Sequence, residues 1–252
     1  MSRSGPAQLP FRSASHQPNP IVLAIDTAGS ACSAAVTRGG VVLAAERRPM
    51  RHGHGEALLP MIDRVVAATG LAPERIDIVA AATGPGGFTG IRVGLAAAHG
   101  IALATGARLI GISSFEAVAA SVGDDRSMLV ALDSRREDLY VQPFAPAPHR
   151  TAMDRPLAVL PGALADYLEA AGLPPATPLL IAGDAANAAA AALKGRSGIA
   201  VADDSAPDAL GVAAAVLRLL RDGGPADRAR PLYLRPPDVS LPKSRQVAPS
   251  LS

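Results

Sequence analysis

A glycine-dense stretch, GPGGFTGIRVG, runs from Gly84 to Gly94 and has the residue types of a phosphate-binding loop. It joins a predicted strand to a predicted helix, and that geometry presents free backbone N–H groups to an anion. A Walker-type loop would carry Lys and then Ser or Thr after its last glycine. Here Ile91 and Arg92 follow Gly90. We therefore favour close packing, in which Gly90 and Gly94 let another backbone approach the helix, and keep an anion site as the alternative.

The stretch DTAGS, from Asp26 to Ser30, is a second candidate site at the end of the apolar run IVLAID. A carboxylate followed by hydroxyls and a glycine can hold a hydrated cation or a phosphate. The same groups can instead satisfy the backbone of their own turn, which is the interpretation we favour. Asp26, Thr27 and Ser30 are retained as the candidate cofactor-binding residues of a degenerate phosphate turn.

Histidine and cysteine do not combine into a recognisable metal site or nucleophile. His52 and His54 flank Gly53 and precede Glu56, whereas a zinc-peptidase helix needs the order His-Glu-x-x-His. The chain has no Gly-x-Ser-x-Gly turn of a serine hydrolase. Cys32 falls in an apolar strand pattern and is expected to be a small buried residue. The sequence therefore predicts neither a bound metal nor a catalytic residue.

The segments that must position these residues alternate between strand and helix patterns. Residues 32–48 are predicted to form a hairpin with its tip at Arg38 to Gly40. Apolar residues at helical spacing predict a helix over 54–69, stopped by Gly70, and a second over 91–105, closed by Gly106. Further strands are predicted at 21–26, 76–83 and 108–113, and further helices at 114–122 and 207–221.

A short repeat relates the two halves of the chain. Leu23 to Thr27 and Val130 to Ser134 both read as a strand that ends in Asp and a hydroxyl residue. Each is followed by a polar turn and a second strand, which suggests a duplicated unit. The alternation of elements indicates an α/β protein with two related halves.

Composition limits the classes of function. The 252 residues are 49% hydrophobic and 18% charged, which is typical of a globular protein. A net charge of +2 is too small to indicate a dedicated nucleic-acid groove, and the basic residues Arg135, Arg136, Lys243 and Arg245 have no interleaved aromatics. The single cysteine excludes an internal disulfide. No apolar run is expected to reach the ~18 residues of a membrane span.

Both ends read as tails. Residues 1–19 contain two arginines and no acid, and they lack the apolar centre of a secretory signal. We expect a disordered tail or an over-long start, with an organelle transit peptide as the alternative. Residues 236–252 are rich in Pro and Ser and are also expected to be a flexible tail.

Several motifs together resemble the TsaB (YeaZ) family. They are the IVLAIDT and ACS runs, HGEALLP, GPGGFTGIRVGLAAAHGIA, GISSFEAVA, LDSRREDLYVQ and PLYLRPPDV, and the likeness covers residues 21–237. The resemblance implies an actin/Hsp70/sugar-kinase-like (ASKHA) fold of two lobes, each with a β-β-β-α-β core. We expect the lobes at 20–113 and 114–235, with the last helix packing back on the first lobe.

The resemblance also implies a function. TsaB proteins are the non-catalytic partners of TsaD, which transfers a threonylcarbamoyl group to a tRNA adenosine beside the anticodon, and TsaE is the ATPase of the complex. TsaD binds its metal through a His-x-x-x-His pair, and the matching residues here are Ser114 and Val118. Val118 cannot bind a metal, and serine is a poor ligand. The chain is therefore expected to be no enzyme by itself.

The expected partners follow from the same likeness. They are a TsaD-like subunit in a heterodimer, a TsaE-like ATPase, tRNA indirectly through the complex, and a second copy when the chain is alone. No membrane and no cofactor are expected, apart from weak ATP or ADP binding, and the location is expected to be cytoplasmic. The predicted interface lies on the two long helices and comprises His54, Leu58, Met61, Ile62, Val65, Gly90, Val93, Gly94, Ala97 and Ala98.

Three alternatives stay open at this point. The first is a metallopeptidase of the M22 type, whose label TsaB-like sequences often carry. The second is a nucleotide-binding, kinase-like enzyme, because Asp26, Asp133 and Gly183-Asp184 keep parts of such a layout. The third is a homodimeric binding protein unrelated to tRNA.

Overall fold

The structure is a computed structural model that describes residues 19–223 and 229–235. The two expected tails, 1–19 and 236–252, lie outside the described residues except for Asn19. The first half contains β1 (Ile21–Asp26), β2 (Ala31–Arg38), β3 (Val41–Pro49), α1 (His54–Ala68), η1 (Pro73–Arg75), β4 (Ile78–Ala82), α2 (Phe88–Thr105), β5 (Arg108–Ile112) and α3 (Ser114–Ser121). The second half contains β6 (Ser127–Asp133), β7 (Leu139–Phe144), β8 (Leu157–Val159), η2 (Pro161–Ala163), α4 (Leu164–Ala170), β9 (Leu179–Ala182), α5 (Ala186–Ala192), β10 (Ile199–Val201) and α6 (Ala209–Arg221).

The two halves form matching sheets. The first is ordered β3-β2-β1-β4-β5, and the second, read in the same sense, is β8-β7-β6-β9-β10. In both, the first three strands pair antiparallel and the last two add in parallel. Helices also follow the same strands in each half. This duplication confirms the predicted class, an α/β protein of the actin/Hsp70/sugar-kinase-like (ASKHA) fold with two β-β-β-α-β lobes.

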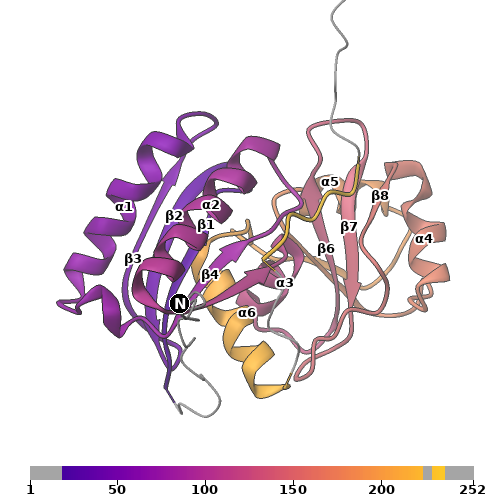
Figure 1. The fold of residues 1–252 in the computed structure, drawn as a ribbon. Helices are drawn as coiled ribbons and strands as arrows, with labels where there is room; N and C mark the ends of the chain where they lie inside the picture. The colour runs from indigo at the N-terminus through magenta and orange to yellow at the C-terminus, as the bar shows by residue number, and fades with distance from the viewer. Residues whose placement is uncertain (1–18, 224–228, 236–252) are drawn as a thin grey trace, which may run out of the picture.

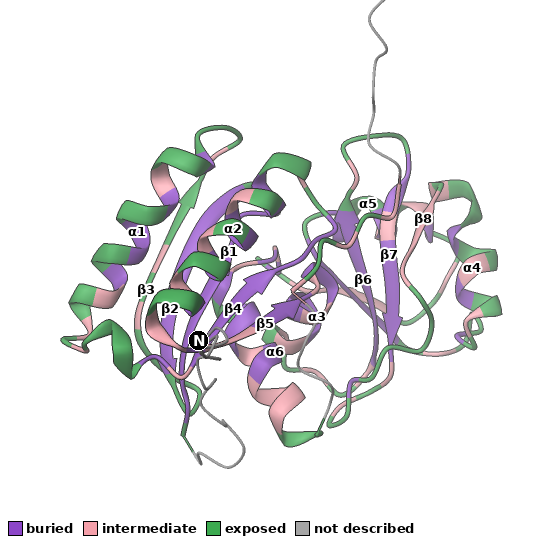
Figure 2. Ribbon diagram, in the orientation of Figure 1, coloured by how far each residue is buried: buried purple, intermediate pink, exposed green. Residues whose placement is uncertain are grey.

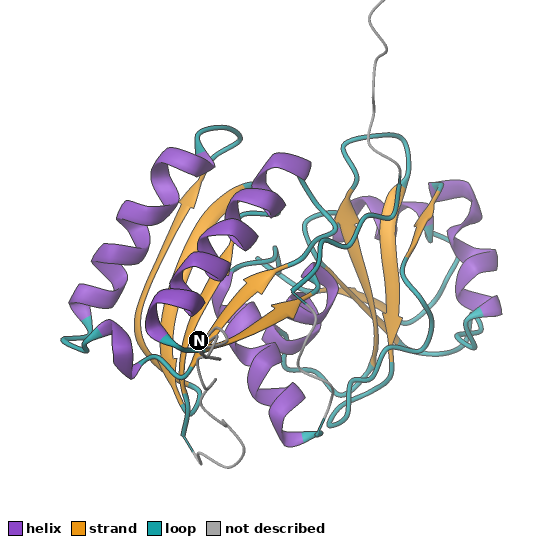
Figure 3. Ribbon diagram, viewed as in Figure 1, coloured by secondary structure: helices purple, strands orange, loops and turns teal. Residues whose placement is uncertain are grey.

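Helices cover both faces of each sheet (Figure 1, Figure 3). Helices α1 and α2 pack on the outer face of the first sheet, and α5 packs on the second sheet against β6, β9 and β10. Helices α3 and α6 pack against each other between the sheets. The order of layers is therefore helix, sheet, helix, sheet, helix, which buries both faces of the parallel strands.

The central helices interlock the two lobes. Helix α6 comes from the second half but packs on the first sheet, where its Ala209 N–H donates to Ser33 Oγ at 2.9 Å. Helix α3 follows the first sheet but places Phe115 in the core of the second. Gly211 lets α6 approach α3, because an added methyl group there would meet the carbonyl of Ala117. The division at residues 113 and 114 stays a prediction.

The helix and turn signals of the first lobe are confirmed, with one shifted boundary. The hairpin turns at Gly39 and Gly40, both at positive φ, and α1 ends just before Gly70. Helix α2 ends at Gly106, whose φ of 71° closes it as predicted. It begins at Phe88, three residues before the predicted start at Ile91, because glycine in a first turn does not prevent helix formation.

Helix α2 also corrects the expectation that no segment is apolar enough to span a membrane. It has 18 residues and a mean hydropathy of 1.2, so it meets that criterion by length and composition. In the fold it packs against β1, β4 and β5, with Ile91, Leu95 and Ala98 buried. Contact with the sheet thus accounts for the third of this helix that is buried.

Candidate functional site at the junction of the two lobes

The Asp26 turn is closed upon itself and upon α2. Asp26 Oδ1 accepts a hydrogen bond from Ala28 N at 2.7 Å, and Thr27 Oγ1 donates to the carbonyl of Gly90 at 2.7 Å. Both side chains are buried. Ser30, the third predicted cofactor-binding residue, is instead exposed, and its carbonyl accepts from Met50 N at 2.9 Å. The turn therefore uses its first polar groups for its own structure.

Burial gives the Asp26 carboxyl group an unusual electrostatic state. Desolvation raises its pKa to about 6, against the lowering effect of the Ala28 hydrogen bond, and Asp208 and Asp184 raise it further. Among the described residues, Asp26 Oδ2 has no hydrogen-bond partner. The pKa of Asp184 is also raised, mainly by desolvation. Burial thus disfavours negative charge on the Asp26 carboxyl group.

The glycines of the Gly84 to Gly94 stretch allow close packing against this turn. A methyl group added at Gly90 would overlap the carbonyl oxygen of Thr27, and one at Gly86 would overlap that of Ala28. Gly87 N donates to the Ala28 carbonyl at 2.7 Å. The packing interpretation is confirmed, because backbone of the Asp26 turn lies directly against Gly86, Gly87 and Gly90. Nucleotide binding stays a prediction.

The matching turn of the second lobe is open. Asp133 Oδ1 accepts from Arg135 N at 2.7 Å, and Ser134 Oγ donates to the Asp138 carbonyl at 2.6 Å. Arg135 adopts a φ of 61° and is exposed. Its guanidinium reaches the first lobe, 3.5 Å from the carbonyl oxygen of Gly29 and close to Gly87. The two predicted turns therefore meet across the junction of the lobes.

A short segment near the C-terminus, residues 229–235, crosses this junction; Figure 1 draws it in yellow between the lobes. Leu232 N donates to the carbonyl of Thr83 at 2.8 Å in the first lobe. The Tyr233 ring stacks on Phe88 with 5.2 Å between centroids, and Arg235 forms an ion pair with Asp138 of the second lobe. We call residues 229–235 the strap.

Sequence reasoning missed the strap and its aromatic contact. Arg92 lies over the Phe88 ring at 3.8 Å from its centroid, and its Nε donates to Tyr233 OH at 3.1 Å. The run PLYLR was the only sequence feature of the strap that we noted. It contributed to the family resemblance, but no contact was predicted from it. Local sequence patterns could not predict the contact between Arg92 and Tyr233, because these residues are 141 positions apart.

The predicted interface residues need correction. Most of them face the core of this chain rather than solvent: they are His54, Leu58, Met61, Ile62, Val65, Gly90, Gly94 and Ala98. Val93 and Ala97 are only partly exposed. The apolar stripe of each helix is covered by the first sheet, so these side chains cannot contact another subunit in this conformation. Figure 2 shows the buried stripes of α1 and α2 turned inward.

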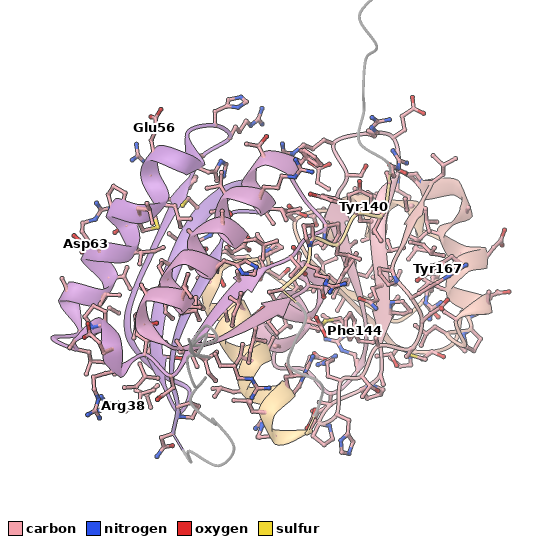
Figure 4. The ribbon with its side chains drawn as sticks, viewed as in Figure 1. Arg38, Glu56, Asp63, Tyr140, Phe144 and Tyr167 are labelled. Atoms are coloured by element: carbon pink, nitrogen blue, oxygen red, sulfur yellow. The ribbon has the colours of Figure 1, made fainter. Side chains whose placement is uncertain are left out.

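The outer faces of the same helices carry different residues. Leu59 on α1 is 56% exposed and Leu103 on α2 is 69% exposed. Ala96, Gly100 and Ala104 on α2 are exposed small residues. Glu56 and Asp63 project outward from α1 (Figure 4). This outer surface, with two large apolar side chains among small and charged ones, is the part of the two helices that a partner could reach.

The two positions that the resemblance sets against the metal pair of TsaD are built into the core. Ser114 Oγ donates to the Pro85 carbonyl at 3.0 Å, and both Ser114 and Val118 are buried. His54 is buried, and its pKa is lowered mainly by desolvation, with Arg135 and His52 adding to the effect. Within residues 19–223 and 229–235, no group of three or more His, Cys, Asp or Glu side chains could hold a metal ion.

Comparison with known proteins agrees with this architecture. A family model described as "TsaD: tRNA N6-adenosine threonylcarbamoyltransferase" matches residues 37–147. An uncharacterized protein of Mycobacterium tuberculosis is 33% identical over 224 residues, 86% of this chain and 93% of that protein. A protein of Escherichia coli named "tRNA threonylcarbamoyladenosine biosynthesis protein TsaB" is 36% identical over 123 residues, 47% of this chain and 52% of that protein. The chain thus spans about half the length of the curated TsaB relatives it matches.

A solved structure gives the same picture for the fold. A Pseudomonas aeruginosa protein described as similar to peptidase YeaZ superposes with a TM-score of 0.72 at 23% identity, over 86% of this chain and 100% of that one. The two lobes, with the same strand order and the same β-β-β-α-β core, define a protein of the ASKHA fold. Within that class, the chain belongs to the TsaB (YeaZ) family.

Proposed function

We propose that this chain is the non-catalytic subunit that binds and activates a TsaD-like subunit in the synthesis of threonylcarbamoyladenosine in tRNA. Membership of the TsaB family supports this role, because relatives carry that pathway in their names. The observation that carries the non-catalytic part is the burial of Ser114 and Val118 in hydrogen-bonded and apolar packing. Neither side chain is free to hold a metal, which also argues against the metallopeptidase alternative.

The partner would dock on the outer faces of α1 and α2. Leu59 and Leu103 supply apolar side chains there, and Ala96, Gly100 and Ala104 allow the backbone of a partner helix to approach α2. The match of residues 37–147 to a TsaD model indicates that TsaD shares this part of the fold, so two similar lobes can pair with near-twofold symmetry. The same surface would pair two copies of this chain when TsaD is absent.

Activation would come from selective binding. A subunit shifts its partner's conformational equilibrium only if it binds one conformation better than the other. This chain would therefore stabilise the competent form of TsaD, with a TsaE-like ATPase completing the complex. Assays of tRNA modification with this chain, TsaD and TsaE, each omitted in turn, test the role directly. TsaD turnover that is unchanged when this chain is added contradicts it.

A surface variant tests the docking site. We expect Leu103→Arg to weaken binding to TsaD by at least about tenfold, because it would bury an unpaired charge in the proposed contact. The matched control is Leu160→Arg, since Leu160 is 57% exposed but lies in the second lobe. Binding is measured by calorimetry, with thermal unfolding as the check on folding. Equal affinity of the two variants would place the contact elsewhere.

A further inference from the structure

The aromatic pair at the start of α2 is exposed although it is ordered by several contacts. Phe88 and Tyr233 are each 39% exposed, and their rings stack at an interplanar angle of 29°. Arg92, also exposed, lies over Phe88 and donates to the Tyr233 hydroxyl. The strap is held nearby through Leu232 and Arg235. A rigid aromatic surface with a guanidinium beside it is therefore presented to solvent.

The fold gathers further cationic groups at the same edge. The ends of β1 and β6 meet where the Arg135 guanidinium approaches Gly29 and Gly87, and Gly87 directly precedes Phe88. Arg51 and His52 follow β3, which runs parallel to β1 and ends at the same edge of the first sheet. All three of these basic residues are exposed. In the sequence, by contrast, Arg135 had no aromatic neighbour to suggest a nucleic-acid contact.

Acidic side chains lie mostly on the other side of this edge. Asp133, Glu137 and Asp184 are exposed and belong to the second lobe, whereas Glu56 is the exposed acid at the start of α1. Asp133 and Asp184 each accept a backbone N–H group. Of these acids only Glu56 belongs to the first lobe, which also carries Phe88 and Arg92.

We propose that Tyr233 and Phe88, with Arg92 and Arg135, form a binding surface for single-stranded RNA. Aromatic faces stack on unpaired bases whatever their identity, and arginines beside them bind the phosphates. The inference rests on the proposed function for the identity of the RNA, which would be an unpaired segment of the tRNA substrate. It gives this chain a direct RNA contact in addition to its contact with TsaD.

An RNA partner fits this surface better than a protein partner does. Leu59 and Leu103 are the large aliphatic side chains exposed on α1 and α2, and they suit a protein contact. Leu59 lies on a different helix from Phe88, and Leu103 lies at the opposite end of α2 from it. The aromatic edge offers ring faces and guanidinium groups instead. Protein interfaces can also use Tyr and Arg, so this alternative is made an outcome of the test.

The test uses the full chain and a fluorescent oligouridylate of about ten nucleotides, followed by anisotropy at low salt. We expect Tyr233→Ala to weaken binding by about tenfold or more, and Tyr233→Phe to retain most of the affinity because the ring face remains. Arg135→Ala should lower the slope of log K against log salt by about 0.7, the value for one phosphate contact on a single strand. Arg155→Ala, an exposed arginine of the second lobe, is the matched control.

Each result bears on the proposal. Loss of binding in Tyr233→Ala but not in Tyr233→Phe, with unchanged thermal midpoints, supports it. No binding by the wild-type chain at low salt, or equal affinity of Tyr233→Ala and wild type, overturns it. If Tyr233→Ala weakens binding to TsaD and leaves RNA binding intact, the surface is a protein contact and the RNA proposal fails. In all these cases the Leu103→Arg experiment still judges the docking role separately.

Discussion

The turns after β1 and β6 have the same local structure but opposite surroundings. In each, the aspartate at the strand end accepts the backbone N–H two residues later, at 2.7 Å in both. Asp26 is buried beneath α2, whereas Asp133 is exposed. The duplicated sequence therefore fixes the turn, and the helix that follows the fourth strand of each lobe decides whether the turn is open.

That helix differs sharply between the lobes. Helix α2 has 18 residues and contacts the Asp26 turn through Gly90, with Gly86 of the preceding turn also packed on it, whereas α5 has 7 residues. In the first lobe, backbone packs directly against the Asp26 turn. In the second lobe, Arg135, Arg136 and Glu137 of the matching turn are exposed. The comparison indicates that the first turn serves stability, whereas the second is the turn whose Arg135 we propose as a contact for RNA.

The largest effect should come from reopening the closed turn. In Gly90→Ala the new methyl group would overlap the carbonyl of Thr27, which is backbone and cannot rotate away. We expect the free energy of unfolding to fall by about 3 kcal/mol or more, since overpacking of this kind forces the backbone to move. Urea unfolding followed by circular dichroism measures the change.

Gly100→Ala is the control on the same helix. Gly100 is exposed, and no atom lies within 4 Å of an added methyl group. This substitution should raise the free energy of unfolding by up to about 1 kcal/mol, because alanine is the better helix former. A loss in Gly100→Ala as large as that in Gly90→Ala would mean that the contact with Thr27 does not explain the effect.

Much of the fold could be predicted from local pattern. The strands of the first lobe, the hairpin at Gly39 and the helix ends at Gly70 and Gly106 follow from apolar runs and from glycines at positive φ. The repeat around Asp26 and Asp133 was short, yet the two sheets have the same order. These features could be predicted because each depends on residues close together in the sequence.

The faces of α1 and α2 could not be assigned in this way. Helical periodicity identifies an apolar stripe but does not say whether a sheet or a second protein covers it. Leu58 and Met61 were therefore assigned to a partner although they pack on β-strands of the same chain. The prediction that Gly90 lets another backbone approach the helix was correct. That backbone belongs to Thr27 of the same chain and not to a partner. Such contacts require the tertiary structure.

A smaller effect is expected from removing the buried charge of the closed turn. The pKa of Asp26 is about 6 in the folded state, because of burial, and about 3.9 when unfolded. Above pH 6 both states are ionised and the fold carries a buried charge. As the pH falls from 6 to 4, the folded state binds a proton first, so this group's contribution to stability rises.

Asp26→Asn should therefore be more stable than wild type by about 2–3 kcal/mol at pH 8, the equivalent of a shift of about 2 pKa units. The difference should shrink towards pH 4, where the wild-type carboxyl is already neutral in the fold. Urea unfolding at the two pH values measures it. Asp133→Asn, in the open turn, should change the free energy of unfolding by less than about 0.5 kcal/mol. A benefit of Asp26→Asn that does not vary with pH would contradict the burial argument.

The smallest effect concerns the backbone of the open turn. Arg135 has a φ of 61°, in the left-handed region that costs residues other than glycine about 1 kcal/mol. Arg135→Gly and Arg135→Ala both remove the guanidinium, but only the glycine variant relieves this conformation. We expect Arg135→Gly to exceed Arg135→Ala by about 1 kcal/mol in free energy of unfolding, while both lose RNA affinity equally. This result would show that Arg135 is kept at this position for the contact its side chain makes, despite its backbone conformation. Equal stability of Arg135→Gly and Arg135→Ala would contradict this explanation.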